Sequence, residues 1–245
     1  MRIDKHALAI ISICGSALDM LGALYLAYDL LGGEHGPLRI LSRAVTYGAL
    51  FAAGYGVVLG PVFGLASGAA NGLTLAWELS RASRQEAVPG FWYESAMAAI
   101  RGLGFGLGLS YLFGPRFGFA FGVLSTLGQV IAYQRGVRPS LDYAPSTRPH
   151  MSRHQMLAVI TRTAGYSIAG YFSAFVGGQR TRALHLGLEV GLLVGVVTAV
   201  ASVCMPVVEW TADHMPERRM GVFGVVCILI GFTLQSVQYW AVLLE

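Results

Sequence analysis

Apolar residues run through this chain in long stretches, separated by short groups of glycine, proline and charged residues. The stretch 46–80, for example, is almost uncharged over 35 residues. A helix needs about 20 residues to cross the hydrocarbon core of a bilayer, so this stretch suits two spans better than one. Span length predicts eight helices, near 7–31, 43–59, 61–80, 93–113, 116–135, 155–177, 183–207 and 219–243.

The connections between these helices alternate in length. The short turns are Gly60-Pro61, Gly114-Pro115-Arg116 and Gly177-Gly178-Gln179-Arg180, and glycine and proline commonly end one helix and begin the next. The side that carries the long loops has 12 arginines, against five basic residues on the other side. The positive-inside rule then places the long loops in the cytoplasm and both termini outside the cell membrane. Arg2 and Lys5, which precede the first helix, disagree with this orientation.

Composition agrees with a membrane protein. Only 12% of residues are charged and 55% are hydrophobic, whereas an ordinary soluble domain carries about 25% charged residues. We therefore expect an all-α fold in one transmembrane domain, 1–245. The irregular loop 136–154 would separate a first half, 1–135, from a second half, 155–245, with four helices in each.

An arginine is followed four residues later by an aromatic and then a small residue at four places. The spacings between these arginines are 58, 61 and 57 residues. The copies are Arg43-Tyr47-Gly48, Arg101-Phe105-Gly106, Arg162-Tyr166-Ser167 and Arg219-Phe223-Gly224. The pattern predicts four tandem hairpin repeats, parallel and related by an axis along the membrane normal.

Three of the helices that precede these arginines end near an acid, so each repeat can bring an acid and an arginine to a similar depth. Charges near a membrane interface are costly unless they pair or reach the headgroups. The predicted cytoplasmic pairs are Asp29 with Arg43, Glu78 with Arg101, and Glu209 with Arg219. In the remaining unit Gln134 replaces the acid, which leaves Arg162 without a partner. Anchoring of these arginines at the inner leaflet is the alternative, and Asp19 is another candidate anion for Arg162.

Small residues recur at every fourth position, as in a glycine zipper. The longest row is Gly48, Ala52, Gly56, Gly60, Gly64, Gly68, Gly72 and Ala76. Such rows let helix backbones approach closely in lipid. We expect them to pack helices within one chain; a glycine-lined pore, a homo-oligomer seam or a membrane protein partner is the alternative.

A few polar residues fall within the apolar stretches. An ionisable group at membrane depth is a candidate functional residue, so Asp19 is the first candidate for midplane binding or coupling, with Asn71, Gln129 and Gln235 as neutral candidates. Hydrogen bonding between helices is the structural alternative. Arg182, His185 and Glu189 share one helix face and are candidates for an outer vestibule, against an ordinary solvated helix end.

Signatures of other functions are missing from the sequence. It contains no HExxH, P-loop or CxxC motif, and its three cysteines lie in apolar stretches. We expect no catalytic residues, cofactor or bound metal, and no nucleic-acid partner; the basic side faces membrane lipid. The leading hypothesis is a small permease or channel-like transport protein. A non-catalytic scaffold, subunit or lipid-interacting protein is the alternative.

Overall fold

A computed structural model describes residues 5–30, 39–83, 90–137, 146–214 and 217–243. Every regular element in these ranges is a helix, which confirms the all-α class for the described part of the chain. The helices are α1 (Lys5–Leu30), α2 (Arg39–Leu59), α3 (Pro61–Ser83), α4 (Phe91–Phe113), α5 (Pro115–Gln134), α6 (Arg153–Val176), the short 3-10 helix η2 (Arg180–Arg182), α7 (Ala183–His214) and α8 (Glu217–Leu243).

The predicted helices agree with the observed ones to within a few residues, except at the end of α7. The sequence reading ended this helix at 207, but α7 continues to His214 with Pro206 in its interior. Proline removes one helical hydrogen bond and disfavours the helix without always ending it. The Pro206 carbonyl accepts a hydrogen bond from the Ser146 amide at 3.1 Å, which ties the start of the segment before α6 to this part of α7.

The tight turns owe their shape to glycine. Gly60 ends α2 with φ 89° and Gly114 ends α4 with φ 94°, a left-handed region that other residues rarely occupy. Proline follows each glycine as the first residue of the next helix, where its fixed φ suits the helix and its missing amide proton costs nothing. Each Gly-Pro pair therefore closes a hairpin between consecutive helices.

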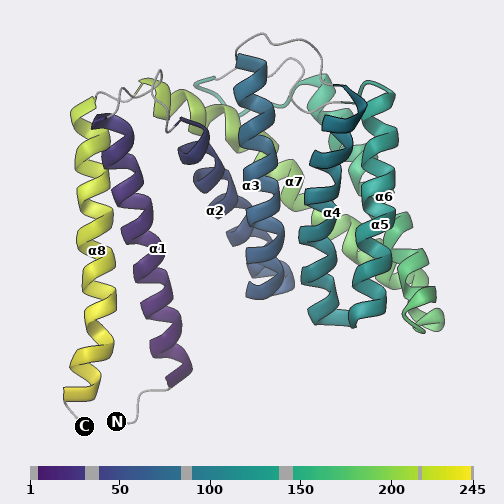
Figure 1. The fold of residues 1–245 in the computed structure, drawn as a ribbon, viewed down its shortest axis with the longest axis horizontal. Coiled ribbons are helices and arrows are strands. Elements are labelled where there is room, and N and C mark those ends of the chain that lie inside the picture. The colour runs from purple at the N-terminus through teal and green to yellow at the C-terminus, as the bar shows by residue number, and fades with distance from the viewer. Residues whose placement is uncertain (1–4, 31–38, 84–89, 138–145, 215–216, 244–245) are drawn as a thin grey trace. The chain divides into compact units, whose positions relative to one another are not determined.

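The described helices group into two compact units. One unit comprises residues 1–42 and 212–245 and contains α1 and α8; the other comprises residues 43–211. This division differs from the predicted halves at 1–135 and 155–245, which stay a prediction. Within the first unit α1 and α8 lie side by side and antiparallel (Figure 1), with Gly15 against Gly231 and Gly22 against Gly224.

Glycines also form the closest helix contacts in the 43–211 unit. A Cβ added to Gly72 of α3 would lie 2.5 Å from the Cα of Gly48 on α2, and one added to Gly64 would lie 2.6 Å from the Cα of Gly56. The α4–α5 contact is similar, since a Cβ on Gly106 would lie 2.9 Å from the Gly118 carbonyl. These distances leave no room for a side chain between the backbones.

Aromatic rings fill the core of this unit. Phe105 on α4 lies 5.0 Å from Tyr166 on α6 and 5.6 Å from Tyr55 on α2, measured between ring centroids. Phe121 on α5 lies 5.8 Å from Tyr166. Phe105 and Tyr166 are the aromatics of two Arg-aromatic-small motifs, so these motifs direct their rings inward and bring their helices together.

Two of the helices in the described ranges, Phe91–Phe113 and Arg180–Val208, are long and apolar enough to cross a membrane. Shorter apolar helical segments are Cys14–Ala27 and Gly221–Val237.

The glycine contacts predict a clear stability difference. Gly72→Ala should destabilise the protein by about 1–3 kcal/mol, because the new methyl group meets the backbone of α2. Gly165→Ala is the matched control, since a Cβ there meets nothing within 4 Å, and it should be neutral or stabilising by up to about 1 kcal/mol. Thermal unfolding of the detergent-purified variants measures both; equal midpoints would contradict the close approach of α2 and α3.

Candidate functional site

The most buried charge in the described chain is Arg101, which α4 directs into the 43–211 unit. Its side chain is 1% exposed, and its Nη2 atom lies 2.9 Å from Glu78 Oε1 of α3. Its Nε donates to Thr74 Oγ1, also on α3, at 2.8 Å. Its Nη1 donates to the hydroxyl of Tyr133 on α5. One guanidinium therefore connects three helices.

Tyr133 completes this cluster from the α5 side. Its hydroxyl donates to Glu78 Oε1 at 3.0 Å while it accepts from Arg101. Burial of a charge is tolerated when the charge is both paired and hydrogen-bonded, and Arg101 satisfies both conditions. The chain itself therefore supplies the partners of Arg101, while Glu78 Oε2 has no hydrogen-bond partner among the described residues.

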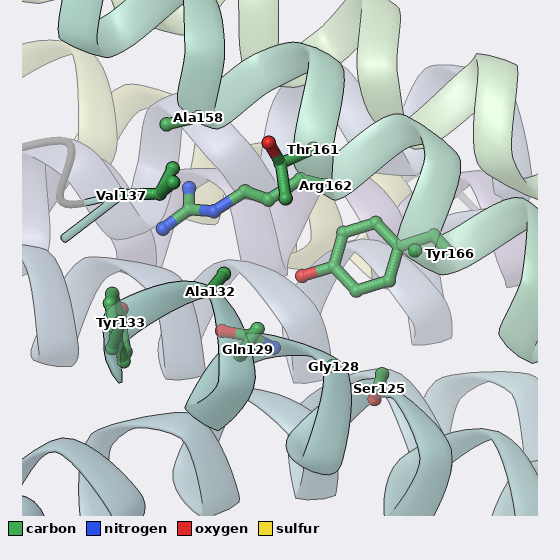
Figure 2. A pocket seen from close by; sticks show the side chains of 11 residues that line it. Ser125, Gly128, Gln129, Ala132, Tyr133, Val137, Ala158, Thr161, Arg162 and Tyr166 are labelled. Carbon is green, nitrogen blue, oxygen red and sulfur yellow. The ribbon is translucent and has the colours of Figure 1, made fainter. Parts of the chain in front are cut away.

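A cavity of about 30 Å³ lies next to this cluster, between α5 and α6. Figure 2 shows Gln129 and Tyr133 of α5 facing Arg162 and Tyr166 of α6 around it. The remaining lining residues are Ser125, Gly128, Ala132, Val137, Ala158, Thr161 and Gly165. Their spacing of three or four residues on each helix places them on the facing sides of α5 and α6.

Two polar groups in this cavity have no hydrogen-bond partner among the described residues. Gln129 is 5% exposed, and neither its amide nitrogen nor its amide oxygen is bonded. Arg162 is half-buried, and its buried Nη2 atom is likewise without a partner. Buried polar groups are nearly always hydrogen-bonded, so each exception calls for a missing partner. A ligand or ordered water would supply one.

The start of α6 is fixed by a capping box that the sequence reading did not identify. The Ser152 hydroxyl accepts from the Gln155 amide at 3.2 Å, and the Gln155 side chain accepts from the Ser152 amide at 2.8 Å. The signal was present in the sequence as Ser-x-x-Gln ahead of an apolar run. This box fixes the first turn of the helix that carries Arg162.

The four polar residues proposed for the midplane do not form one group. Asp19 accepts a hydrogen bond from Gln235 Nε2 at 2.6 Å, which joins α1 to α8. Asn71 donates to the Ser67 carbonyl of its own helix at 2.8 Å. Gln129 alone lines the cavity. Asp19 thus joins two helices and Asn71 bonds within its own helix, while Gln129 lines the cavity between α5 and α6.

The other predicted residues occupy varied positions. Arg43 donates to Ser80 Oγ at 3.4 Å, and the side chains of Asp29, Glu209 and Arg219 lie outside the described part of the structure. At the proposed outer vestibule, His185 Nδ1 lies 3.4 Å from Glu189 Oε2 on the surface of α7. Arg182 is exposed in η2 before that helix begins.

Sequence reasoning missed several residues of the site. Thr74 and Tyr133 bind Arg101, and Ser125 and Thr161 line the cavity. Tyr133 directly precedes Gln134, the residue that replaces the acid in its predicted repeat. Within the described residues, no three histidine, cysteine, aspartate or glutamate side chains gather into a group that could hold a metal ion.

The chain matches no family model, no curated protein and no solved structure.

The Arg101 cluster predicts which acid matters for stability. Glu78→Gln should destabilise the protein by about 3–5 kcal/mol, because it leaves a buried guanidinium without its counter-charge. Glu189→Gln is the control: its pair with His185 is exposed and contributes less than about 1 kcal/mol. Thermal unfolding in detergent measures both variants. A Glu78→Gln midpoint as high as that of Glu189→Gln would show that the pair does not support the fold.

Proposed function

We propose that this chain is a small multispan membrane transport protein of the permease or channel-like kind. The observation that carries the proposal is the cavity between α5 and α6, in which Gln129 and Arg162 keep unpartnered polar atoms. Polar groups that lie at membrane depth without a hydrogen-bond partner are typical of a binding site or a transport path. Groups that only hold helices together are normally satisfied by those helices.

The distribution of apolar residues supports a membrane location. Exposed apolar side chains recur at every fourth position on the outer sides of the helices, while Arg101, Glu78 and Gln129 lie inside. The exposed rows include Leu103, Leu107 and Tyr111 on α4, Phe119, Val123, Leu127 and Ile131 on α5, and Leu184, Leu188, Leu192, Val196 and Val200 on α7. Such an apolar surface is unfavourable in contact with water and favourable in contact with lipid.

Two helices are long and apolar enough by themselves to cross a membrane. We extend the proposal to the other long helices of the chain. Helices α1 to α8, without η2, have 20 to 32 residues each, enough to cross a bilayer. In the proposed arrangement all eight span the membrane, the long loops lie in the cytoplasm, and both termini lie outside. The excess of arginine on the long-loop side supports this orientation.

The glycine contacts support the proposed repeat. The small residue of each motif packs against the neighbouring helix of a pair: Gly48 against Gly72, Gly106 against Gly118, and Ser167 against Gly191. In the fourth motif Gly224 of α8 packs against Gly22 of α1. In the proposed repeat the small residue of each motif thus lies at a helix contact, and α8 with α1 forms the fourth pair.

Transport can be tested in proteoliposomes by stopped-flow light scattering, with potassium formate and urea as probes and valinomycin to carry potassium. We expect the protein to accelerate entry of at least one probe relative to empty liposomes. Gln129→Leu should lower that rate about tenfold, the effect of the roughly 1–2 kcal/mol that one buried hydrogen bond contributes. Gln134→Leu, at the exposed end of α5, is the control and should match the wild type. No acceleration of either probe would contradict the proposal.

The second candidate is a non-transporting scaffold or subunit, and the contact between Asp19 and Gln235 favours it. In that case Asp19 serves only to join α1 to α8. This structural role of Asp19 is the alternative to a coupling role in transport. The two roles predict different effects of substituting Asp19.

Replacement of Asp19 separates these roles. Asp19→Asn keeps an acceptor for Gln235, so stability should change by less than about 1 kcal/mol, whereas Asp19→Leu leaves the half-buried amide unpaired and should cost about 1–3 kcal/mol. Thermal unfolding measures both variants. If probe entry is unchanged in Asp19→Asn, the residue is structural; a large loss of entry at normal stability would assign it to the transport path.

A further inference from the structure

Arg101 and Arg162 occupy equivalent positions in two motifs but have different surroundings. Each precedes by four residues an aromatic ring of the core, Phe105 and Tyr166, and these two rings lie 5.0 Å apart. Arg101 binds Glu78, Thr74 and Tyr133. Arg162 has no ion pair among the described residues, and its Nη2 atom faces no acceptor.

The difference follows from one position of the repeat. Glu78, which pairs with Arg101, corresponds to Gln134 in the following unit, and Gln134 is exposed at the end of α5. Among the described residues, no acid therefore fills the place beside Arg162 that Glu78 fills beside Arg101. Arg101 is paired with Glu78, and Arg162 is the charged residue among those described as lining the cavity.

Gln129 adds a second donor to the same space. Its side chain is 5% exposed and both of its polar atoms are unpartnered. A cavity lined by an amide donor and a guanidinium donor is suited to an acceptor that carries negative charge, because hydrogen bonds to ionised groups are about twice as strong as neutral ones. Water could fill the space but would leave the charge of Arg162 uncompensated.

We propose that the cavity between α5 and α6 binds one small anion, held by Arg162 and Gln129 in the place of the missing carboxylate. This inference rests on the proposed function and names the ligand class of its binding site. The volume of about 30 Å³ exceeds the roughly 10–15 Å³ that one water needs, and it suits a halide or a formate-sized carboxylate. A nucleotide or a sugar phosphate does not fit.

The anion can come from two sources with the same chemistry: a free ion, or the anionic oxygen of a lipid headgroup. The side chain of Arg162 is half-buried, so both sources can reach it. Binding of a free ion does not depend on the lipid present. A headgroup would compete with the ion only where anionic lipid is supplied.

The test is equilibrium dialysis of radiolabelled formate against the full chain in neutral detergent, with sodium gluconate holding the ionic strength constant. We expect saturable binding of one formate per chain, displaced by chloride. Arg162→Gln should weaken binding at least about tenfold. Arg116→Gln removes an exposed arginine at the start of α5 and should bind as the wild type does. Absence of saturable binding to the wild type would overturn the inference, as would unchanged binding by Arg162→Gln.

Two further variants test the chemistry of the site. Gln129→Glu supplies an internal carboxylate beside Arg162, so it should abolish formate binding and raise the unfolding midpoint. Asp142→Asn removes an acid from the 138–145 segment, which lies outside the described residues, and should leave binding unchanged. If the wild type fails to bind formate and Asp142→Asn binds it, the chain supplies its own anion and the inference is wrong.

The source of the anion is decided by repeating the measurement in nanodiscs. Equal formate affinity in phosphatidylcholine and in phosphatidylglycerol discs identifies the free ion as the ligand, and a loss confined to phosphatidylglycerol identifies the headgroup. Formate binding and transport are measured separately, so each can fail without the other. Formate binding without entry into liposomes keeps the anion site and rejects transport, whereas urea entry without formate binding keeps transport and rejects the anion site.

Discussion

The guanidinium of Arg101 determines how α3, α4 and α5 meet. A charge enclosed by apolar helices has to find all its partners inside the protein, because neither water nor lipid supplies them. Arg101 finds them on two neighbouring helices, at Thr74, Glu78 and Tyr133. The rotation of each of these helices about its axis is therefore fixed, and with it the row of apolar residues that each turns outward. Glycine contacts bring the backbones together, but the charge decides which faces meet.

The same constraint explains why the cavity lies where it does. The Tyr133 hydroxyl accepts from Arg101 and donates to Glu78, and it accepts no hydrogen bond from the Nη2 atom of Arg162 on α6. Arg101 thus finds its partners on α3 and α5, whereas the Nη2 atom of Arg162 has none among the described residues. The proposed repeat places Glu78 before Arg101 and Gln134 before Arg162, and the proposed anion site depends on that one difference.

The sequence predicted the helices well because their ends have local causes. Gly60 and Gly114 end helices through positive φ, and proline begins the next ones. The predicted end of α7 at 207 was too early, because the helix continues past Pro206 to His214. The acid and arginine of the pair formed by Glu78 and Arg101 were visible as a repeated pattern. The partner of Asp19 and the cavity beside Gln129 were not visible, because helical periodicity gives the face of a residue and not the helix that will cover it. Asp19 meets Gln235 more than 200 residues away, and nothing local to either residue indicates that contact.

The pairing of α1 with α8 has a consequence for biosynthesis. Helix α1 is synthesised before α8 and packs against it, with Gly22 facing Gly224 and Asp19 facing Gln235. Domains generally fold in the order in which they are made, so the 43–211 unit can assemble before α8 is available to α1. Throughout that interval the Asp19 carboxylate and the glycine face of α1 lack the contacts that cover them in the folded protein. Synthesis of α8 therefore sets when α1 can dock.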